Sequence, residues 1–373
     1  MNQPSTGRLT GHLPSLDGWR AVAILLVIVC HQPQFPSPGV KGLGPVGVSL
    51  FFGLSGLLIT RLLLEQYRAS GSFGLREFYI RRAFRILPPC LVFIAAYTAL
   101  GCWKSGLEFT SSLFFFRNYV PDSVAGFGSG HLWSLSVEEH FYLIWPGLLA
   151  FVMTRRSKHA AANTAAALAL GFGLWRMIES QLPTHLLPLA PAHFRTDLRL
   201  DALLWGCVAA FVLDGSKERE KFASQFRWPA FAGAAAVLIL SIRYYSSLTS
   251  VWIAVLIPAL LAGTLVHPEW WICRALSWAP VTWLGRISYS LYLWQQLFFP
   301  PGWHQASQWW MHWPANLGLA FAAASLSYYL VEKPLIAIGR RYANMRFDAS
   351  IFKYSAAAIK QSPAVIRKGT FQP

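Results

Sequence analysis

The sequence predicts an all-α fold, a polytopic integral membrane bundle of about ten transmembrane helices. Only 13% of its 373 residues are charged and 54% are hydrophobic, whereas a soluble domain carries about 25% charged residues. A spanning helix needs roughly 20 mostly apolar residues, and runs of this kind follow one another along the chain. They occupy 14–31, 45–64, 84–103, 132–153, 160–178, 197–213, 228–243, 249–267, 281–299 and 314–337.

The distribution of lysine and arginine predicts the orientation of these spans. With a cytoplasmic N-terminus, the inner segments hold 24 of the 32 basic side chains and the outer segments hold 6. Because cytoplasmic loops carry such an excess, we expect a multi-pass protein of the inner (plasma) membrane with both termini in the cytoplasm. The same excess explains the net charge of +16, so the expected partner is the lipid bilayer and not nucleic acid.

A membrane domain at 1–345 is predicted to precede a basic, poorly ordered tail at 346–373. No small-residue cleavage site follows the first apolar run, so we expect that run to be retained as a span. The five cysteines are an odd number and lack CxxC or His/Cys ligand spacing. They are predicted to be free thiols, with no metal site.

The first span carries three ionisable side chains, Asp17, Arg20 and His31. Such residues are costly inside a membrane and are therefore functional candidates. Arg20 and His31 lie on one helix face, about 16 Å apart along the axis, and Asp17 lies one turn before Arg20. The structural alternative is a snorkelling Arg20 and an interfacial His31 at the end of the span.

An arginine cluster, Arg81, Arg82 and Arg85, lies at the start of the third apolar run. On a helix, Arg82 and Arg85 share a face, as do Arg81 and Arg85. Guanidinium groups hold phosphate oxygens in pairs, so the cluster suits a polyphosphate such as that of coenzyme A. The alternatives are an ordinary basic flank of a span or contact with anionic lipid.

The run at 131–146 has the strongest functional signal, because two adjacent carboxylates, Glu138 and Glu139, lie inside a span. Packing alone does not explain charged pairs in such a place. Ser134, Glu138 and Tyr142 follow one another at i, i+4 and i+8, so they form one stripe of the helix.

Arg199 and Asp201 enter the sixth apolar run. An internal ion pair and a substrate-binding role are equally compatible with this placement. In the predicted orientation the arginine cluster lies near the inner face, whereas His31, Glu138, Arg199 and Asp201 lie in the outer half. An acyl thioester whose polyphosphate head lies inside would join the two groups, which favours a transferase.

At these residues the chain resembles the membrane acyltransferase-3 family, which includes O-antigen and other cell-envelope O-acetylases. The resemblance runs from about Leu13 to Arg341. It is carried by an ordered set of motifs: 16–21 followed by His31, the glycine-rich 47–56, Arg82 with Arg85, 132–146, 288–294 and 332–334. His140 and Gln295 depart from the pattern, because Gln and His respectively are common there.

The resemblance implies a ten-helix O-acyltransferase that moves an acyl group, usually acetyl, from acyl-coenzyme A to a carbohydrate or glycolipid hydroxyl. It implies that His31 is the essential catalytic residue and that Arg20, Arg82 and Arg85 bind the donor. No permanently bound cofactor is expected. Many relatives carry an additional C-terminal hydrolase-like domain, and we expect this chain to complete the transfer alone or with a partner.

The hypothesis from the residues is direct transfer, with neutral His31 as general base. Glu138 is expected to orient the imidazole or stabilise its charged form, and Glu139 is a second catalytic candidate. Arg81 joins the donor-binding set. The residues expected to bind substrate are Asp17, Ser134, Tyr142, Arg199 and Asp201. A covalent acyl-enzyme remains an alternative route, and a multi-pass transporter or flippase of a lipid-linked or sugar substrate is the alternative function.

Overall fold

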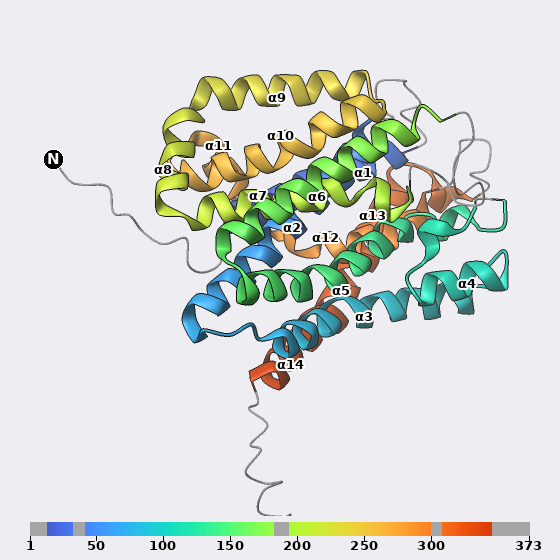
Figure 1. Cartoon of the computed structure of the whole chain (residues 1–373). Coiled ribbons are helices and arrows are strands. Elements are labelled where there is room, and N and C mark those ends of the chain that lie inside the picture. Colours follow the sequence, from blue (N-terminus) through green and yellow to red (C-terminus); the bar gives the residue numbers. More distant parts are fainter. Residues whose placement is uncertain (1–12, 33–41, 122, 183–193, 300–307, 345–373) are drawn as a thin grey trace, which may run out of the picture.

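The computed structural model describes residues 13–32, 42–121, 123–182, 194–299 and 308–344, and every regular element in these ranges is helical (Figure 1). The helices are α1 (Pro14–His31), α2 (Leu43–Ser70), α3 (Leu75–Ala99), α4 (Gly106–Leu113), α5 (Leu132–Arg155), α6 (Lys158–Glu179), α7 (Leu200–Asp214), α8 (Ser216–Gln225), α9 (Trp228–Arg243), α10 (Ser247–Val266), α11 (Trp271–Leu276), α12 (Ala279–Phe298), α13 (Ala315–Ser327) and α14 (Lys333–Asn344). Short 3₁₀ turns η1 (Arg117–Tyr119), η2 (Phe127–Ser129), η4 (Thr196–Leu198) and η6 (Trp309–Met311), and the π-helical turn η7 (Tyr328–Glu332), complete the described elements. The predicted all-α class is confirmed.

Each of the ten predicted spans coincides with a helix, although the bounds differ. Four helices, α1, α2, α3 and α10, are long and apolar enough to cross a membrane, and the α8–α9 pair, bent by 77°, would be a fifth. The remaining predicted spans contain shorter helices or helices with polar side chains, such as α5 with its two glutamates. The number of ten crossings therefore stays a prediction, and the predicted tail at 346–373 lies outside the described residues.

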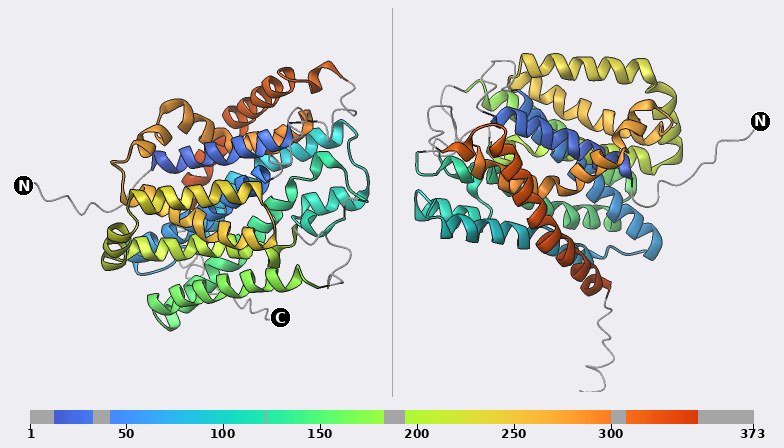
Figure 2. Two further views of the ribbon diagram at one scale, coloured as in Figure 1. Left: turned by 90° about the horizontal axis from the view of Figure 1, so that it is seen from above. Right: turned by 180° about the vertical axis from the view of Figure 1, so that it is seen from behind.

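The helices form three layers. In Figure 1 and in the two further views of Figure 2, α9 and α10 cover one side, α3 and α14 lie on the opposite side, and α1, α2, α7 and α12 fill the middle. The α8–α9 bend brings α9 back along α10, so this outer layer is far from α3.

Close approach of backbones holds α2 against α7. A Cβ atom at Gly56 would lie 1.8 Å from the carbonyl oxygen of Leu203, and one at Gly206 would lie 2.3 Å from that of Gly53. Small residues allow helices to pack this closely in membranes, where dispersion contacts drive association. The glycine-rich 47–56 segment therefore has a packing role in addition to its place in the motif.

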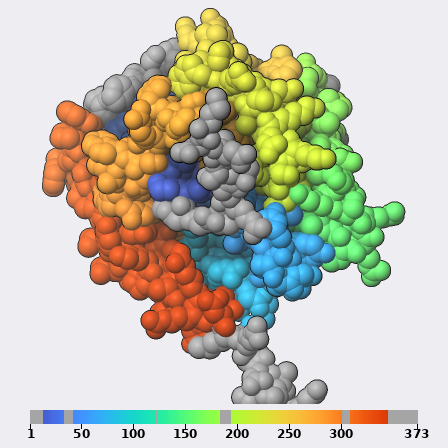
Figure 3. All heavy atoms as spheres, turned by 90° about the vertical axis from the view of Figure 1, so that its left-hand side faces the viewer, coloured from blue at the N-terminus to red at the C-terminus, as the bar shows by residue number. Residues whose placement is uncertain are grey.

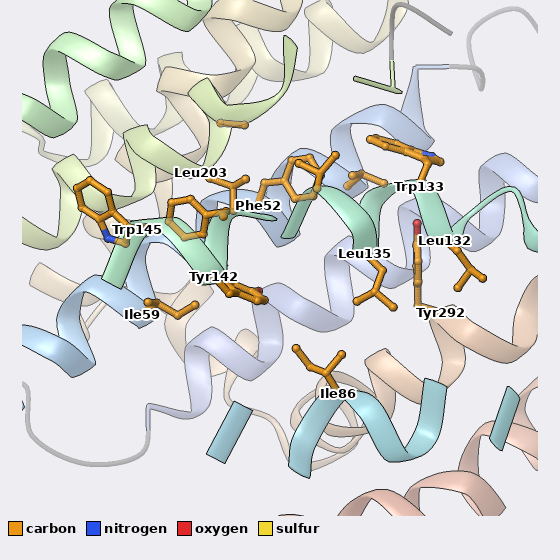
Figure 4. Packing of buried hydrophobic residues seen from close by; sticks show 14 of the residues in the cluster. Phe52, Ile59, Ile86, Leu132, Trp133, Leu135, Tyr142, Trp145, Leu203 and Tyr292 are labelled. Carbon is orange, nitrogen blue, oxygen red and sulfur yellow. The ribbon is translucent and has the colours of Figure 1, made fainter. Parts of the chain in front are cut away.

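Helix α5 crosses the middle of the bundle and packs on both sides. Leu203 of α7 and Phe52 of α2 lie on one side of it, while Leu135 and Tyr142 lie on the side that faces Ile86 of α3 (Figure 4). The space between α3 and α5 on this second side belongs to the cavity described next.

Candidate functional site

Two neighbouring cavities lie between α1, α2, α3, α5 and α12. One, of about 460 Å³, is lined by arginine side chains and is called the arginine cavity. The other, of about 570 Å³, contains His31 and is called the histidine cavity. Val48 of α2 and Tyr292 of α12 line both of them. These two side chains are therefore the wall that the cavities share.

Three helices bring guanidinium groups to the arginine cavity. Arg20 comes from α1, and the cluster of three comes from α3. The full set is Arg20, Arg81, Arg82, Arg85 and Arg340, the last from α14, and among the described lining residues Glu138 is the one carboxylate. This excess of positive charge suits a ligand with several phosphate groups.

The predicted bounds of the third span were displaced, and the displacement matters for this cavity. Helix α3 begins at Leu75, nine residues before the predicted span at 84–103. The three arginines of the cluster therefore lie within one helix, as their predicted common faces require. Phe78, Arg81, Arg82, Arg85 and Ile86 accordingly project from one side of α3 into the cavity.

Helix α2 supplies a mostly apolar wall opposite the arginines. Its contributing positions repeat every three or four residues, which places them on one face. They are Val48, Phe51, Phe52, Ser55, Leu58, Ile59 and Leu62. From Val48 to Leu62 this face extends about 21 Å along the helix axis, so the cavity is elongated and has an apolar side suited to a flexible arm.

Hydrogen bonds and a ring contact hold the polar lining in place. Arg20 Nη1 lies 2.8 Å from Asp17 Oδ1, and the Arg82 guanidinium lies 3.7 Å from the centre of the Tyr142 ring. Glu138 accepts hydrogen bonds from Ser55 Oγ at 2.8 Å and from the Tyr142 hydroxyl at 2.9 Å.

The contacts of Glu138 change one prediction. Its two carboxylate oxygens accept from Ser55, which lines the arginine cavity, and from Tyr142, whereas His31 Nδ1 lies 3.0 Å from Gln295 Oε1. The expected contact of Glu138 with His31 is thus replaced by a contact of Gln295 with His31.

His31 lines the histidine cavity at the end of α1. With Gln295 Oε1 as the acceptor of this contact, Nδ1 of His31 is the donor, which defines one of the two neutral tautomers. The other ring nitrogen, Nε2, then has a lone pair available, which is the form that a general base requires. Phe127 contacts the imidazole edge to face, with ring centres 6.4 Å apart.

Two residues of α12, Tyr292 and Gln296, form hydrogen bonds with the start of α5. Gln296 Oε1 accepts from the backbone N–H of His131 at 3.1 Å. The Tyr292 hydroxyl donates to the His131 carbonyl oxygen at 2.9 Å and lies 2.5 Å from Ser134 Oγ. About one turn of α12 therefore contacts both the end of α1 and the start of α5.

Aromatic side chains form one side of the histidine cavity. Trp133 stacks on Phe194 with ring centres 4.7 Å apart, and Arg199 lies 5.5 Å from the centre of the Trp133 ring. Arg199 also donates to the Tyr245 hydroxyl at 3.2 Å. Amphipathic aromatic groups of this kind combine apolar contact area with a polar edge, which suits the faces of sugar rings.

Other residues singled out from the sequence lie in different places in the structure. Asp201 is fully buried and forms an ion pair with Arg176, which agrees with its structural alternative. Glu139 is not among the described residues that line either cavity. His140 lies 2.7 Å from Thr196 through Nδ1.

Three residues of the site were given no functional role by the sequence analysis. Gln295 was noted only as a departure from the family pattern, Tyr292 only as part of a motif, and Arg340 only as one of many basic residues near the C-terminus. Gln295 contacts His31 from a segment distant in the sequence, so spacing along one helix does not identify it. No local signal in the sequence places Arg340 beside α3.

The comparisons with known proteins agree with these features. Residues 13–332 match a family described as "Acyltransferase domain". The chain is 29% identical over 380 residues to a Bacillus subtilis protein provisionally named peptidoglycan O-acetyltransferase YrhL, a match that covers 90% of this chain and 56% of that protein. It is 27% identical over 363 residues to the Listeria monocytogenes peptidoglycan O-acetyltransferase OatA, covering 87% of this chain and 56% of that one.

The alignments with these two relatives thus cover somewhat more than half of the relatives' own length. No solved structure matches the chain significantly.

Proposed function

The chain belongs to the acyltransferase-3 family of membrane proteins, and from that membership we propose that it transfers an acetyl group from acetyl-coenzyme A to a hydroxyl group of a cell-envelope glycan. The relatives named above are peptidoglycan O-acetyltransferases by their printed names, so peptidoglycan is the proposed acceptor. The arginine cavity is the proposed donor site and the histidine cavity the proposed acceptor site.

One observation carries this proposal, namely that the two cavities share Val48 and Tyr292. A donor whose phosphates contact the arginines can extend its arm along the apolar face of α2 toward that wall. The thioester would then reach the side of the wall where His31 lies. This arrangement needs no movement of the donor head during the reaction.

The proposed chemistry is direct transfer. Nε2 of His31 removes the proton from the glycan hydroxyl while its oxygen attacks the thioester carbonyl carbon. The new ester C–O bond forms, the C–S bond breaks, and the departing thiolate takes the proton from the imidazolium. General-base assistance of this kind accelerates a reaction by about a hundredfold to ten-thousandfold.

The other predicted site residues take supporting places in this proposal. Arg20, Arg81, Arg82 and Arg85 bind the phosphates, with Asp17 orienting Arg20. Glu138 and Ser134 line the donor cavity, and Tyr142 holds Glu138 there through a hydrogen bond. Arg199 lines the acceptor cavity, and Asp201 forms the ion pair with Arg176. The donor cavity faces the cytoplasm, where both termini lie, because the basic residues are concentrated there.

The test replaces His31 by alanine in the full chain, in proteoliposomes with soluble peptidoglycan fragments sealed inside and acetyl-coenzyme A supplied outside. We expect acetyl transfer to fall at least about a hundredfold, with the affinity for coenzyme A unchanged. His159→Ala is the matched control, because this histidine is exposed on α6.

Wild-type protein that binds no coenzyme A and acetylates no glycan would overturn the proposal. Glycan movement across the bilayer without acetylation would instead favour the transporter alternative.

A further inference from the structure

Helix α14 brings a cation into the arginine cavity from outside the region that matches the family. The match ends at residue 332, and α14 begins at Lys333. Ile336 and Arg340 of this helix line the cavity together with the arginines of α3. The segment matched by the family thus does not include Arg340.

Contacts with Phe84 hold α14 against α3. A Cβ atom at Gly339 would lie 2.4 Å from Cβ of Phe84, so the two helices touch at this glycine. The ring of Tyr342 stacks on the ring of Phe84 with centres 5.8 Å apart. Because Phe84 is flanked by the arginine cluster, this packing fixes Arg340 beside it.

Arg340 lies on an exposed part of the cavity lining, whereas Tyr292 of the shared wall is buried. Glu332, just before α14, accepts a hydrogen bond from Ser290 Oγ at 2.8 Å, and Ser290 is two residues from Tyr292. Arg340 follows Glu332 by about 12 Å of helix, and its side chain is exposed. Figure 3 shows this end of the molecule, with α14 in red on one side of a recess and the blue end of α2 on the other.

The proposed function, on which this step rests, orients the donor along the cavity. The thioester points to the shared wall, so the opposite end of coenzyme A, its ribose 3′-phosphate, lies nearest to Arg340. The diphosphate lies between these ends, beside the deeper arginines. A guanidinium group is well suited to a phosphomonoester, because its N–H groups match two phosphate oxygens at once.

We propose that Arg340 forms a separate subsite for the ribose 3′-phosphate of the coenzyme A donor, supplied by α14. This subsite discriminates 3′-phosphorylated donors from donors that lack that phosphate. An anionic lipid headgroup has similar chemistry, and the experiment below distinguishes the two ligands.

The experiment measures the affinity of the full chain, in neutral detergent without anionic lipid, for coenzyme A and for 3′-dephospho-coenzyme A. We expect Arg340→Gln to weaken binding of coenzyme A about tenfold, because a charge-assisted hydrogen bond is lost, and to leave dephospho-coenzyme A binding unchanged. Arg340→Lys should restore part of the preference. Arg341→Gln is the matched control, because Arg341 is equally exposed on α14 but does not line the cavity.

The results separate this inference from the proposed function. No binding of coenzyme A by the wild-type protein would refute the donor site itself. If the wild-type protein binds coenzyme A, two results for Arg340→Gln would refute only the 3′-phosphate subsite. One is an equal loss of affinity for coenzyme A and for 3′-dephospho-coenzyme A, and the other is no loss of affinity for either ligand. An effect of Arg340→Gln that emerges only when phosphatidylglycerol is added would assign Arg340 to lipid and also refute the subsite.

Discussion

The arginine cavity and the histidine cavity adjoin each other but differ in chemistry. The first presents five guanidinium groups and an apolar face of α2. The second presents His31, aromatic rings and Arg199. One environment suits a charged head with a flexible arm, and the other suits a ring-shaped polar ligand beside a base. Under the proposed function, donor binding and acceptor activation would therefore depend on separate sets of residues.

The separation depends on a small number of shared elements. Helix α2 reaches both cavities through Val48, and α12 reaches both through Tyr292. A substitution in the arginine cavity should therefore affect mainly donor binding, and one in the histidine cavity mainly the chemical step. A substitution in the shared wall should lower the rate of acetyl transfer while the donor still binds. The predictions below follow from this division.

The largest effect is expected from removing two cations of the donor cavity. Arg82→Gln with Arg85→Gln should raise the dissociation constant for coenzyme A by about a hundredfold or more, because each charge-assisted hydrogen bond contributes about 1.5–3 kcal/mol. Calorimetric titration of the purified protein measures this.

The matched control for that double variant is Arg155→Gln with Arg156→Gln. It removes the same charge from the exposed end of α5. Equal weakening by both pairs would mean that the arginines of α3 act only through the overall charge of this face, and would remove them from the donor site.

A smaller effect is expected at the shared wall. Val48→Phe adds volume where the cavities meet, and we expect it to lower the rate of acetyl transfer about tenfold to a hundredfold, because a misplacement of the reacting groups by about 1 Å costs up to about a hundredfold in rate. The affinity for coenzyme A should remain close to that of the wild type, because the arginines are untouched.

Val48→Ala is the companion variant, because it opens the wall instead of filling it. Transfer at the wild-type rate by Val48→Phe would show that the donor does not pass this point, and the two cavities would then not form one path.

The smallest effect is expected at Gln295, the positioning residue of His31. Gln295→Leu leaves the Nδ1–H group without its acceptor, which costs about 1–3 kcal/mol. We expect kcat to fall about tenfold with little change in the KM for the donor. Gln295→Glu retains an acceptor at the same place and should recover most of the activity. A change confined to KM would place Gln295 in donor binding instead.

The fold was largely predictable from the sequence, because it depends on local hydropathy. Each predicted apolar run is a helix in the structure. Helix α3 starts nine residues before the predicted span at 84–103, since that span left out Arg81 and Arg82. In the structure those arginines face a cavity, so the helix continues through them.

The candidate site was predictable only in part. Spacing along one helix placed Arg82 with Arg85, and Ser134 with Glu138 and Tyr142, correctly on common faces. Contacts between distant segments, such as Gln295 with His31 and α14 with Phe84, depend on tertiary packing. No periodicity within a single helix contains that information, so the partner of His31 was assigned to Glu138.

The central claim is that one path connects a donor on the arginine side to an acceptor on the histidine side. The most direct test uses proteoliposomes with peptidoglycan fragments sealed inside and membrane-impermeant, isotope-labelled acetyl-coenzyme A outside. The account predicts labelled acetyl esters on the sealed fragments, and their loss in His31→Ala. Labelled esters that form only when donor and glycan share one side of the membrane would contradict it.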